Sequence, residues 1–378
     1  MLRHKAYKFR IYPNKTQANQ IDQTIGCARF VYNEALSLSQ KTYSETGKGL
    51  SYGVLSARLP GLKKESETQW LGNVDSTALQ ASLKDLESAY DRFFKKQNGF
   101  PNFKKKFKSA LSYTTKNNAD SIRIEDGKIK LPKLSWVRFA QSQKIKGRIL
   151  NVTVRQNANQ KYFISVLTEE IIKPLPKTHS SIGIDLGLTD FAILSDGVRI
   201  NNPYFTKRQA QKLAREQRKL SKRALLAKAN GIRFSDAKNY QRQKIIVARL
   251  HQKVVDQRQD FQNKLSTDLI KNHDIICIED LNVKSMMKNK QLAKGIGDVS
   301  WSSFVRQLQY KADWYGKTLV KIDRWYPSSQ ICSVCSHHDG KKALNLRTWT
   351  CSQCTTIHDR DINASRNILA EGLRLLTV

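Results

Sequence analysis

Three acidic residues stand at positions where they could act together in catalysis. Asp185 interrupts the short apolar run that begins at Ser181, and Glu279 ends the apolar run of residues 275–278. Asp361 lies in the first turn of a helix expected near the C-terminus, where the positive helix end favours a carboxylate. Singly, each residue is explained as a capping or ion-paired residue. Together, two strand ends and a helix end would place three carboxylates at one edge of a sheet.

The chemistry that such a cluster serves is phosphodiester hydrolysis. A carboxylate in a buried strand costs several kcal/mol unless it is paired or bound to a cation. Hard cations take oxygen ligands, and two Mg²⁺ ions roughly 3.5–4 Å apart can activate water and stabilise the departing oxygen. We therefore expect Asp185, Glu279 and Asp361 to be catalytic and to hold two Mg²⁺ ions, with Mn²⁺ as a substitute.

A cysteine motif predicts a metal site of another kind. The pattern C-x₂-C-x₁₅-C-x₂-C indicates two knuckles around one structural, tetrahedral Zn²⁺, held by Cys332, Cys335, Cys351 and Cys354. His337 and His338 are competing ligands, but four thiolates already complete the tetrahedron. Two disulfides are the alternative in an oxidising compartment. The other two cysteines, Cys27 and Cys277, are isolated in apolar surroundings and are expected to be core residues.

The charge of the chain indicates its partner. The 378 residues include 66 Lys and Arg against 32 Asp and Glu, a formal net charge of +34 at pH 7. A surface this basic repels itself unless a polyanion neutralises it, so nucleic acid is the expected partner and an anionic membrane surface the alternative. No apolar run approaches the ~20 residues that span a bilayer. The N-terminal MLRHKAYKFRIYP lacks the apolar core and cleavage site of a signal peptide. We expect a cytoplasmic protein without a membrane partner.

The first half of the chain combines strands with inserted helices. Apolar residues at every second position predict a strand over residues 5–12, and strand signals return between about residues 110 and 170. Because a lone strand needs partners, we expect the first strand to pair with the later set in a small β-barrel. Two helices are predicted between them, over residues 16–40 and 76–97, the second capped by Ser76.

The second half would carry the carboxylates. After the Pro-containing linker 171–180, an antiparallel hairpin is predicted over residues 181–197. Residues 205–253 then hold fifteen Lys or Arg and two acids, and we expect this helical stretch to follow a nucleic-acid backbone. An apolar stripe from Ile245 to Leu269 should pack the continuing helix on the sheet.

These motifs together resemble the TnpB family, the RNA-guided nucleases of insertion-sequence transposons and relatives of type V CRISPR effectors. The resemblance is carried by GIDLGLTDFAILSDG, IICIEDLNV, HDRDINAS and the two cysteine pairs, and it extends to YKFRIYPNKTQ, ARFVYN, GFPNFKKKF and WYPSSQICSVC. It covers essentially the whole chain. By this resemblance, Asp185, Glu279 and Asp361 match the catalytic carboxylates of the family, and the four clustered cysteines match its zinc ribbon.

The resemblance implies an α+β multidomain fold with four parts. They are a wedge-like β-barrel (residues 1–13 and 109–178), an inserted helical recognition domain (14–108), an RNase H-like, RuvC-type α/β nuclease domain (179–327 and 357–378) and an inserted zinc ribbon (328–356). Within the ribbon, Ser336 and Thr355 stand where the family usually has glycines. Because glycine eases the tight turn behind each cysteine pair, we expect a slightly strained ribbon that still binds metal.

The function implied by the resemblance is that of an RNA-guided, Mg²⁺-dependent DNA endonuclease. One chain would bind one transposon-derived guide RNA, recognise a short motif beside the target, unwind double-stranded DNA and cut both resulting single strands. A guide-directed repressor without cleavage is an alternative, disfavoured because all three carboxylates are present; a DNA transposase or accessory protein is another. A sugar-kinase-like ATPase would explain GIDLG alone, but the chain shows no second glycine-rich phosphate loop.

Candidates for direct contacts with nucleic acid lie in the first half. Aromatics interleave with lysines in GFPNFKKKFK, so Lys104, Lys105 and Lys106 are expected to meet phosphates, with a solvated basic loop as the alternative. Candidates for reading the DNA motif lie in the turn-rich LSYGVLSA and at the start of the second helix: Tyr52, Ser56, Ser76, Thr77 and Gln80. Gln can bridge adenine N6 and N7, and a Thr methyl can meet a thymine methyl, which favours an A·T-rich motif. The alternative is that Gln80 is a solvated helix residue.

Overall fold

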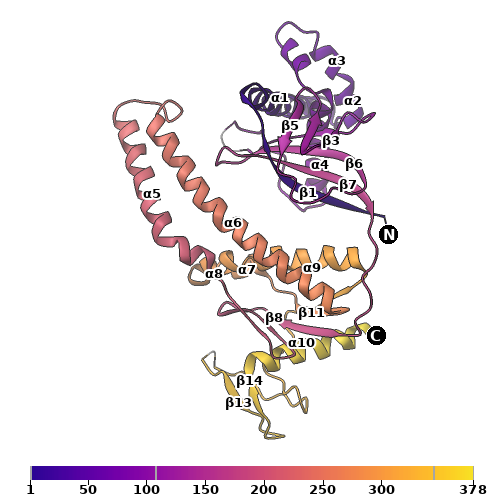
Figure 1. Cartoon of the computed structure of the whole chain (residues 1–378), viewed down its shortest axis with the longest axis vertical. Coiled ribbons are helices and arrows are strands. Elements are labelled where there is room, and N and C mark those ends of the chain that lie inside the picture. The colour runs from indigo at the N-terminus through magenta and orange to yellow at the C-terminus, as the bar shows by residue number, and fades with distance from the viewer. Residues whose placement is uncertain (1, 107–108, 344, 378) are drawn as a thin grey trace. The chain divides into compact units, whose positions relative to one another are not determined.

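The computed structural model describes residues 2–106, 109–343 and 345–377. The chain divides into an N-terminal unit, Leu2–Ile171, and a C-terminal unit, Ile172–Val378 (Figure 1). The division falls at the start of the predicted Pro-containing linker. Phe107 and Lys108, which end the predicted lysine–aromatic segment, lie outside the described residues. Among the described residues, no helix is long and apolar enough to cross a membrane.

The N-terminal unit is built on an antiparallel sheet of order β2-β6-β7-β1-β5-β4-β3. Its strands are β1 Leu2–Tyr12, β2 Leu111–Lys116, β3 Arg123–Glu125, β4 Lys128–Leu131, β5 Ser135–Phe139, β6 Arg148–Gln156 and β7 Tyr162–Ile171. The predicted pairing of the first strand with the later set is confirmed, since β1 lies between β7 and β5. Tyr7, Phe9 and Ile11 are buried, as their alternation predicts. Closure of the sheet into a barrel stays a prediction.

Helices connect β1 to β2 in this unit. They are α1 Lys15–Thr46, α2 Tyr52–Ala57, α3 Leu59–Leu62, the 3₁₀ segment Gln69–Asn73 and α4 Ser76–Phe94. Val31, Leu36 and Leu83 belong to the core that the helices share, while Ile21 and Ile25 pack on the sheet.

Two local expectations for these helices were wrong. The cap of α4 is Asp75 and not Ser76, because Asp75 Oδ1 accepts a hydrogen bond from Thr77 N at 3.0 Å. The segment expected to be rich in turns forms helix α2, whose first turn is capped by the Ser51 hydroxyl.

The C-terminal unit is built on a five-stranded sheet of order β10-β9-β8-β11-β12. Its strands are β8 Ser181–Asp185, β9 Asp190–Leu194, β10 Arg199–Asn201, β11 Ile275–Glu279 and β12 Thr318–Ile322. The predicted antiparallel hairpin is confirmed in β8 and β9. Strands β8, β11 and β12 run parallel, so their carboxyl ends lie at one edge of the sheet.

Helices cover both faces of this sheet. On one face, Ile276 and Ile278 share a core with residues of α6 Lys238–Asn272 and α9 Trp301–Tyr315. On the other face, Cys277 and Ile322 share a core with Ile368 of α10 Arg360–Thr377. Short helices α7 Val283–Met286 and α8 Lys290–Val299 follow β11.

The apolar stripe of α6 packs on the sheet only in part. Phe261, Leu265 and Leu269 join the core of the sheet, whereas Leu250 and Val254 lie outside it. The reason is length, because 35 helical residues at about 1.5 Å each extend far beyond strands of five residues. The first half of α6 lies beside α5 Phe205–Ala229 instead (Figure 1).

The sequence predicts Ile362, Ile368, Leu369 and Leu373 as the apolar face of the last helix, α10, and this prediction is wrong in part. Ile368 is buried, but Ile362, Leu369 and Leu373 are only half-buried. The fully buried positions of α10 are mostly small or polar: Asn363, Ala364, Ser365, Asn367, Ile368 and Gly372. The face therefore packs by close approach and hydrogen bonds, which a search for apolar periodicity does not detect.

Candidate active site

Asp185 and Glu279 extend from the same edge and the same face of the C-terminal sheet. Ile278 lies opposite Ile184 in the parallel pair β11–β8, so the next residue of each strand occupies the next register position. Ile184 and Ile278 face α9, and side chains alternate along a strand. Asp185 and Glu279 therefore face α10.

Helix α10 brings Asp361 to this face. Its residues Ser365 and Leu369 lie so close to Gly183 that a Cβ there would collide with the Ser365 carbonyl. Gly372 likewise leaves room for the Cys277 side chain. The position of the helix is fixed further by Asn367 Nδ2, which donates to the Ser328 carbonyl at 2.7 Å. Asp361 stands in the first turn of the helix, as predicted.

The three carboxylates interact electrostatically. Burial raises the pKa of Asp185 to about 7, and the negative charges of Glu279 and Asp361 act in the same direction. Burial also raises the pKa of Glu279, against the effect of the Ser328 hydroxyl, which donates to Glu279 Oε1 at 2.7 Å. The structure thus brings the three predicted residues together in a site where negative charge is under-compensated, which is the condition for binding a cation.

Two arginines that sequence reasoning missed border the carboxylates. Arg347 Nη1 donates to both oxygens of Asp361, at 3.1 and 3.2 Å. Arg199 Nη2 donates to Asp359 at 2.7 Å, and its Nη1 lies 3.7 Å from Asp361 Oδ2. In a chain with 66 basic residues, nothing in the sequence distinguishes these two.

The donor set fits hard divalent cations. Asp185, Glu279 and Asp361 offer oxygen ligands, the kind that Mg²⁺ and Mn²⁺ take. Within the described ranges, the four clustered cysteines are the one group of three or more Cys, His, Asp or Glu whose ligand atoms all lie within 4.8 Å of one another. The carboxylate oxygens of Asp185, Glu279 and Asp361 do not meet this criterion, so they are more widely spaced than the four sulfurs.

The cysteine cluster has the dimensions of a zinc site. Cys332 and Cys354 have their sulfurs 3.6 Å apart, and those of Cys335 and Cys351 are 3.7 Å apart. A tetrahedron with Zn–S bonds of about 2.3 Å has edges of about 3.8 Å, so the four sulfurs fit one Zn²⁺. The antiparallel pair β13 Thr348–Thr350 and β14 Ile357–Asp359 adjoins the second cysteine pair.

The histidine beside the cluster is not one of those expected. His358 Nε2 lies 3.0 Å from Cys332 Sγ, while neither His337 nor His338 joins the group of ligand atoms. His358 also packs against Trp349, with ring centroids 4.6 Å apart. It is placed to hydrogen-bond a metal-bound thiolate, a contact that orients a ligand from outside the metal shell.

Both knuckles have the strained turn expected from their sequence. Ser336 and Thr355 adopt left-handed φ angles of 62° and 57°. Each amide donates to the carbonyl of the first cysteine of its pair, Ser336 N to Cys332 O at 2.9 Å and Thr355 N to Cys351 O at 3.0 Å. The turn that normally favours glycine is therefore formed by residues with a Cβ.

The candidates for reading DNA differ in how many hydrogen bonds they make within the protein. The Thr77 hydroxyl bonds to Asp75 Oδ2 at 2.8 Å, lies 3.0 Å from the Thr115 hydroxyl and accepts from Lys116 N. Ser76 Oγ accepts from Lys63 Nζ at 2.7 Å. Gln80 is half-buried, as are Tyr52 and Ser56 in α2.

The three lysines of the predicted phosphate-binding segment differ. Lys104 Nζ lies 4.0 Å from the centroid of the Tyr32 ring, and burial lowers the pKa of this lysine. The Lys104 backbone exchanges two hydrogen bonds with the Asn33 side chain. Lys105 and Lys106 are exposed. Lys104 thus contributes to folding of the unit.

Family models match most of the chain. One described as "Helix-turn-helix domain" matches residues 1–48, one described as "Probable transposase" matches residues 163–290, and one described as "Cas12f1-like, TNB domain" matches residues 301–368.

Full-length relatives and a solved structure agree with these matches. Two relatives bear the name "Putative RNA-guided DNA endonuclease". The one from Streptomyces pristinaespiralis is 38% identical, covering 98% of this chain and 89% of the relative. The one from Escherichia coli (strain K12), InsQ, is 35% identical, covering 100% and 94%. The Cas12f1 protein of a Cas12f1–sgRNA–target DNA complex matches with a TM-score of 0.59 at 13% identity, over 97% of this chain and 98% of that chain. The multidomain α+β fold is confirmed by this likeness.

Proposed function

The chain belongs to the TnpB family, and we propose that it is an RNA-guided DNA endonuclease in which Asp185, Glu279 and Asp361 catalyse phosphodiester hydrolysis. The observation that carries the proposal is the electrostatic coupling of these three carboxylates at one sheet edge of a protein with a net charge of +34. The names of its relatives support an RNA guide and a DNA target. The nuclease domain would be of the RuvC type.

Each carboxylate has a distinct place in the proposed mechanism. Two bound Mg²⁺ ions would supply the Lewis acidity that activates water and stabilises the departing oxygen. Asp185, whose pKa is raised to about 7 by burial and by the charges of Glu279 and Asp361, would supply one of their oxygen ligands. Glu279 has one oxygen held by Ser328, which orients the side chain and leaves Oε2 for a cation. Asp361 would complete the site from α10.

The arginines would act on the substrate. In the structure, Arg347 donates hydrogen bonds to Asp361, and Arg199 donates one to Asp359. Once the carboxylate charge is shared with cations, a guanidinium beside Asp361 is free to donate to the oxygens of the scissile phosphate. Guanidinium groups match a phosphate bidentately, so these side chains would help to place the scissile bond over the carboxylates.

The remaining parts would recognise nucleic acid. In the proposed domain organisation, residues 1–13 and 109–178 form the wedge, 14–108 the recognition insertion, 179–327 and 357–378 the nuclease, and 328–356 the zinc ribbon. The exposed lysines and arginines of α5 and the first half of α6 would follow the sugar-phosphate backbone of the guide RNA or its duplex with DNA. Zn²⁺ held by Cys332, Cys335, Cys351 and Cys354 would be structural.

Coexpression with the flanking transposon end provides the test. We expect a stoichiometric protein–RNA complex whose RNA, once sequenced, ends in a segment that can be exchanged to redirect cutting. With Mg²⁺ the complex should cleave a plasmid that carries the matching target beside a randomised flank. Asp185→Ala should bind the same plasmid without cutting it. A protein that purifies without RNA, or that cuts without regard to the guide, would contradict the proposal.

A further inference from the structure

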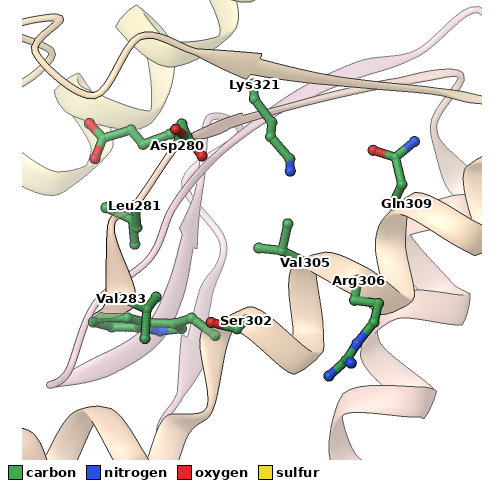
Figure 2. A pocket seen from close by; sticks show the side chains of 10 residues that line it. Asp280, Leu281, Val283, Ser302, Val305, Arg306, Gln309 and Lys321 are labelled. Carbon is green, nitrogen blue, oxygen red and sulfur yellow. The ribbon is translucent and has the colours of Figure 1, made fainter. Parts of the chain in front are cut away.

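A pocket adjoins the catalytic edge of the C-terminal sheet and is not used by the proposed mechanism. It has a volume of about 360 Å³ and lies between the end of β11, the start of α9 and β12 (Figure 2). Sites for small ligands typically have volumes of roughly 300–1,000 Å³, so the pocket has room for one nucleotide-sized group. Glu279 and Asp280 form part of its wall.

The pocket lies across the sheet from the carboxylates but shares their edge. Val320 and Ile322 of β12 belong to the core under α10. Lys321 alternates with them and therefore faces α9. The side chain of Glu279 faces α10, as shown above, so the residue separates the catalytic side of the edge from the pocket. Because Glu279 belongs both to the carboxylate group and to the pocket wall, a strand of nucleic acid bound at the carboxylates would have an adjacent nucleotide at the pocket.

The lining combines an apolar wall with cations. Leu281, Val283, Trp301 and Val305 supply apolar surface, and Figure 2 shows Lys321 and Val305 pointing toward the same space from β12 and α9. Arg306, Lys321 and Gln309 supply polar groups. An apolar surface beside positive charge suits a ligand that has both a flat ring and a phosphate.

The two cations of the pocket are not neutralised from within the protein. In the described part of the chain, the side chains of Arg306 and Lys321 have no hydrogen-bond or ion-pair partner. The one other acid at the wall, Asp280, accepts from Arg324 Nη2 at 2.6 Å. Ser302 also stands in the first turn of the 15-residue helix α9, whose positive end favours an anion. The local field therefore favours a phosphate group.

We propose that this edge pocket binds one nucleotide of the DNA strand being cut, adjacent to the scissile phosphate. The base contacts the wall formed by Leu281, Val283 and Val305, and a flanking phosphate lies near Lys321 and Arg306. This inference rests on the proposed nuclease function and adds to it a positioning site. The pocket holds the DNA strand on one side of Glu279, and Asp185 and Asp361 lie on the other side. The scissile bond is therefore positioned both by the pocket and by the carboxylates.

An abasic scan of the cut strand tests the pocket. The protein–RNA complex is given targets that carry one abasic position at a time around the cut, and single-turnover rates are compared. Wild type should slow about tenfold at one position, since loss of one base contact of this kind has an effect of that order. Val305→Trp, which fills the pocket, should slow intact DNA similarly and become insensitive to the abasic residue at that position. A rate equally sensitive at every position would overturn the proposal.

Charge variants provide a second measurement, which does not depend on filling the pocket with a larger side chain. Arg306→Gln/Lys321→Gln should reduce the cleavage rate about tenfold, by loss of phosphate contacts, while the amount of bound RNA and the affinity for target stay unchanged. Lys288→Gln is the matched control, because Lys288 is an exposed lysine of the same unit that does not line the pocket. Identical behaviour of the double variant and the control would overturn the proposal, as would a loss of guide RNA from the double variant.

Direct binding separates this inference from the proposed function. Thymidine 3′,5′-bisphosphate should bind wild type in calorimetry and bind Arg306→Gln/Lys321→Gln at least about tenfold more weakly. If wild type cuts no guided target but shows this difference, the nuclease proposal fails and the nucleotide pocket stands. If wild type cuts guided targets and the bisphosphate binds both proteins equally, the pocket proposal fails alone.

Discussion

Arg347, a residue of the loop before β13, donates both hydrogen bonds of its Nη1 to the carboxylate of Asp361, at 3.1 and 3.2 Å. A side chain from the segment that holds the four clustered cysteines thus pairs with one of the three catalytic candidates. We therefore predict that a substitution of Arg347 changes the activity of the carboxylate site.

Arg347→Gln should lower the maximal cleavage rate by about 10²-fold, the effect of removing one donor to a developing negative charge. The same variant should need less Mg²⁺ for half-maximal activity, because Asp361 loses a competing cation. A Mg²⁺ titration of the cleavage rate measures both quantities. Arg374→Gln is the control, since Arg374 pairs with Glu371 near the other end of α10. An unchanged maximal rate in Arg347→Gln would contradict the prediction.

The pKa of Asp185 predicts that this residue destabilises the metal-free protein. Its folded-state pKa of about 7 exceeds its ordinary value of 3.8, so the folded state retains a proton that the unfolded state loses. Stability from this group is fully present below the unfolded pKa and is lost as pH rises through the folded pKa. Without added Mg²⁺, Asp185→Asn should therefore raise the free energy of unfolding, by at most about 4 kcal/mol near pH 8 and by less near pH 5.5. The thermal unfolding midpoint should rise accordingly.

Thermal unfolding at the two pH values measures this effect. Asp361→Asn is the matched control, because Asp361 is paired with Arg347 and gains from its charge; this variant should be neutral or destabilising. Millimolar Mg²⁺ should stabilise wild type more than Asp185→Asn, since ligand that binds only the folded state raises its stability. Equal midpoints for wild type and Asp185→Asn at both pH values would show that the carboxylate is not desolvated.

The turn residues of the ribbon predict a gain from glycine. Ser336 and Thr355 have positive φ, which costs an L-residue roughly 1–2 kcal/mol. Ser336→Gly and Thr355→Gly should each stabilise the ribbon by about 1 kcal/mol and slow the release of Zn²⁺ to a chelator. Gly340→Ala is the reverse control: Gly340 has φ of 75° and open space around it, so the added Cβ introduces backbone strain alone.

Metal content tests the ribbon itself. Elemental analysis should find one Zn²⁺ per chain, and Cys332→Ser should lose most of it and unfold the C-terminal part, because metal-binding free energy contributes to folding. His358→Ala should keep the Zn²⁺ but release it faster, since the contact to Cys332 Sγ is lost. Zinc-free wild-type protein would rule out the assignment.

How much of this site the sequence predicts depends on the range of the interactions. Asp185 and Glu279 were predictable because a carboxylate after a short apolar run is a local signal, and the parallel pairing of β8 with β11 then places them together. The contact of Arg199 with Asp359 joins residues 160 positions apart, and local patterns carry no information on such pairs. The polar face of α10 was missed for another reason: Asn363 and Asn367 are buried because they hydrogen-bond carbonyls of the ribbon segment, which no apolar period reveals.

The last prediction concerns how the DNA motif is read. A protein that delegates target sequence to a guide still reads a short element itself, and an amide that reaches adenine N6 and N7 is one means. Gln80 is half-buried on α4, and its side chain has no hydrogen-bond partner within the described residues. Gln80→Ala should relax the motif at one position, with a cost of about 1–3 kcal/mol against the preferred base.

Thr77→Ala separates reading from folding. Its hydroxyl bonds Asp75 and Lys116 N, so its loss should lower the unfolding midpoint and leave the motif unchanged. A randomised flanking library, cut by wild type and by both variants, measures the motif, and thermal unfolding measures stability. If Gln80→Ala keeps the wild-type motif and rate, Gln80 is a solvated helix residue and the reading contact lies elsewhere in the N-terminal unit.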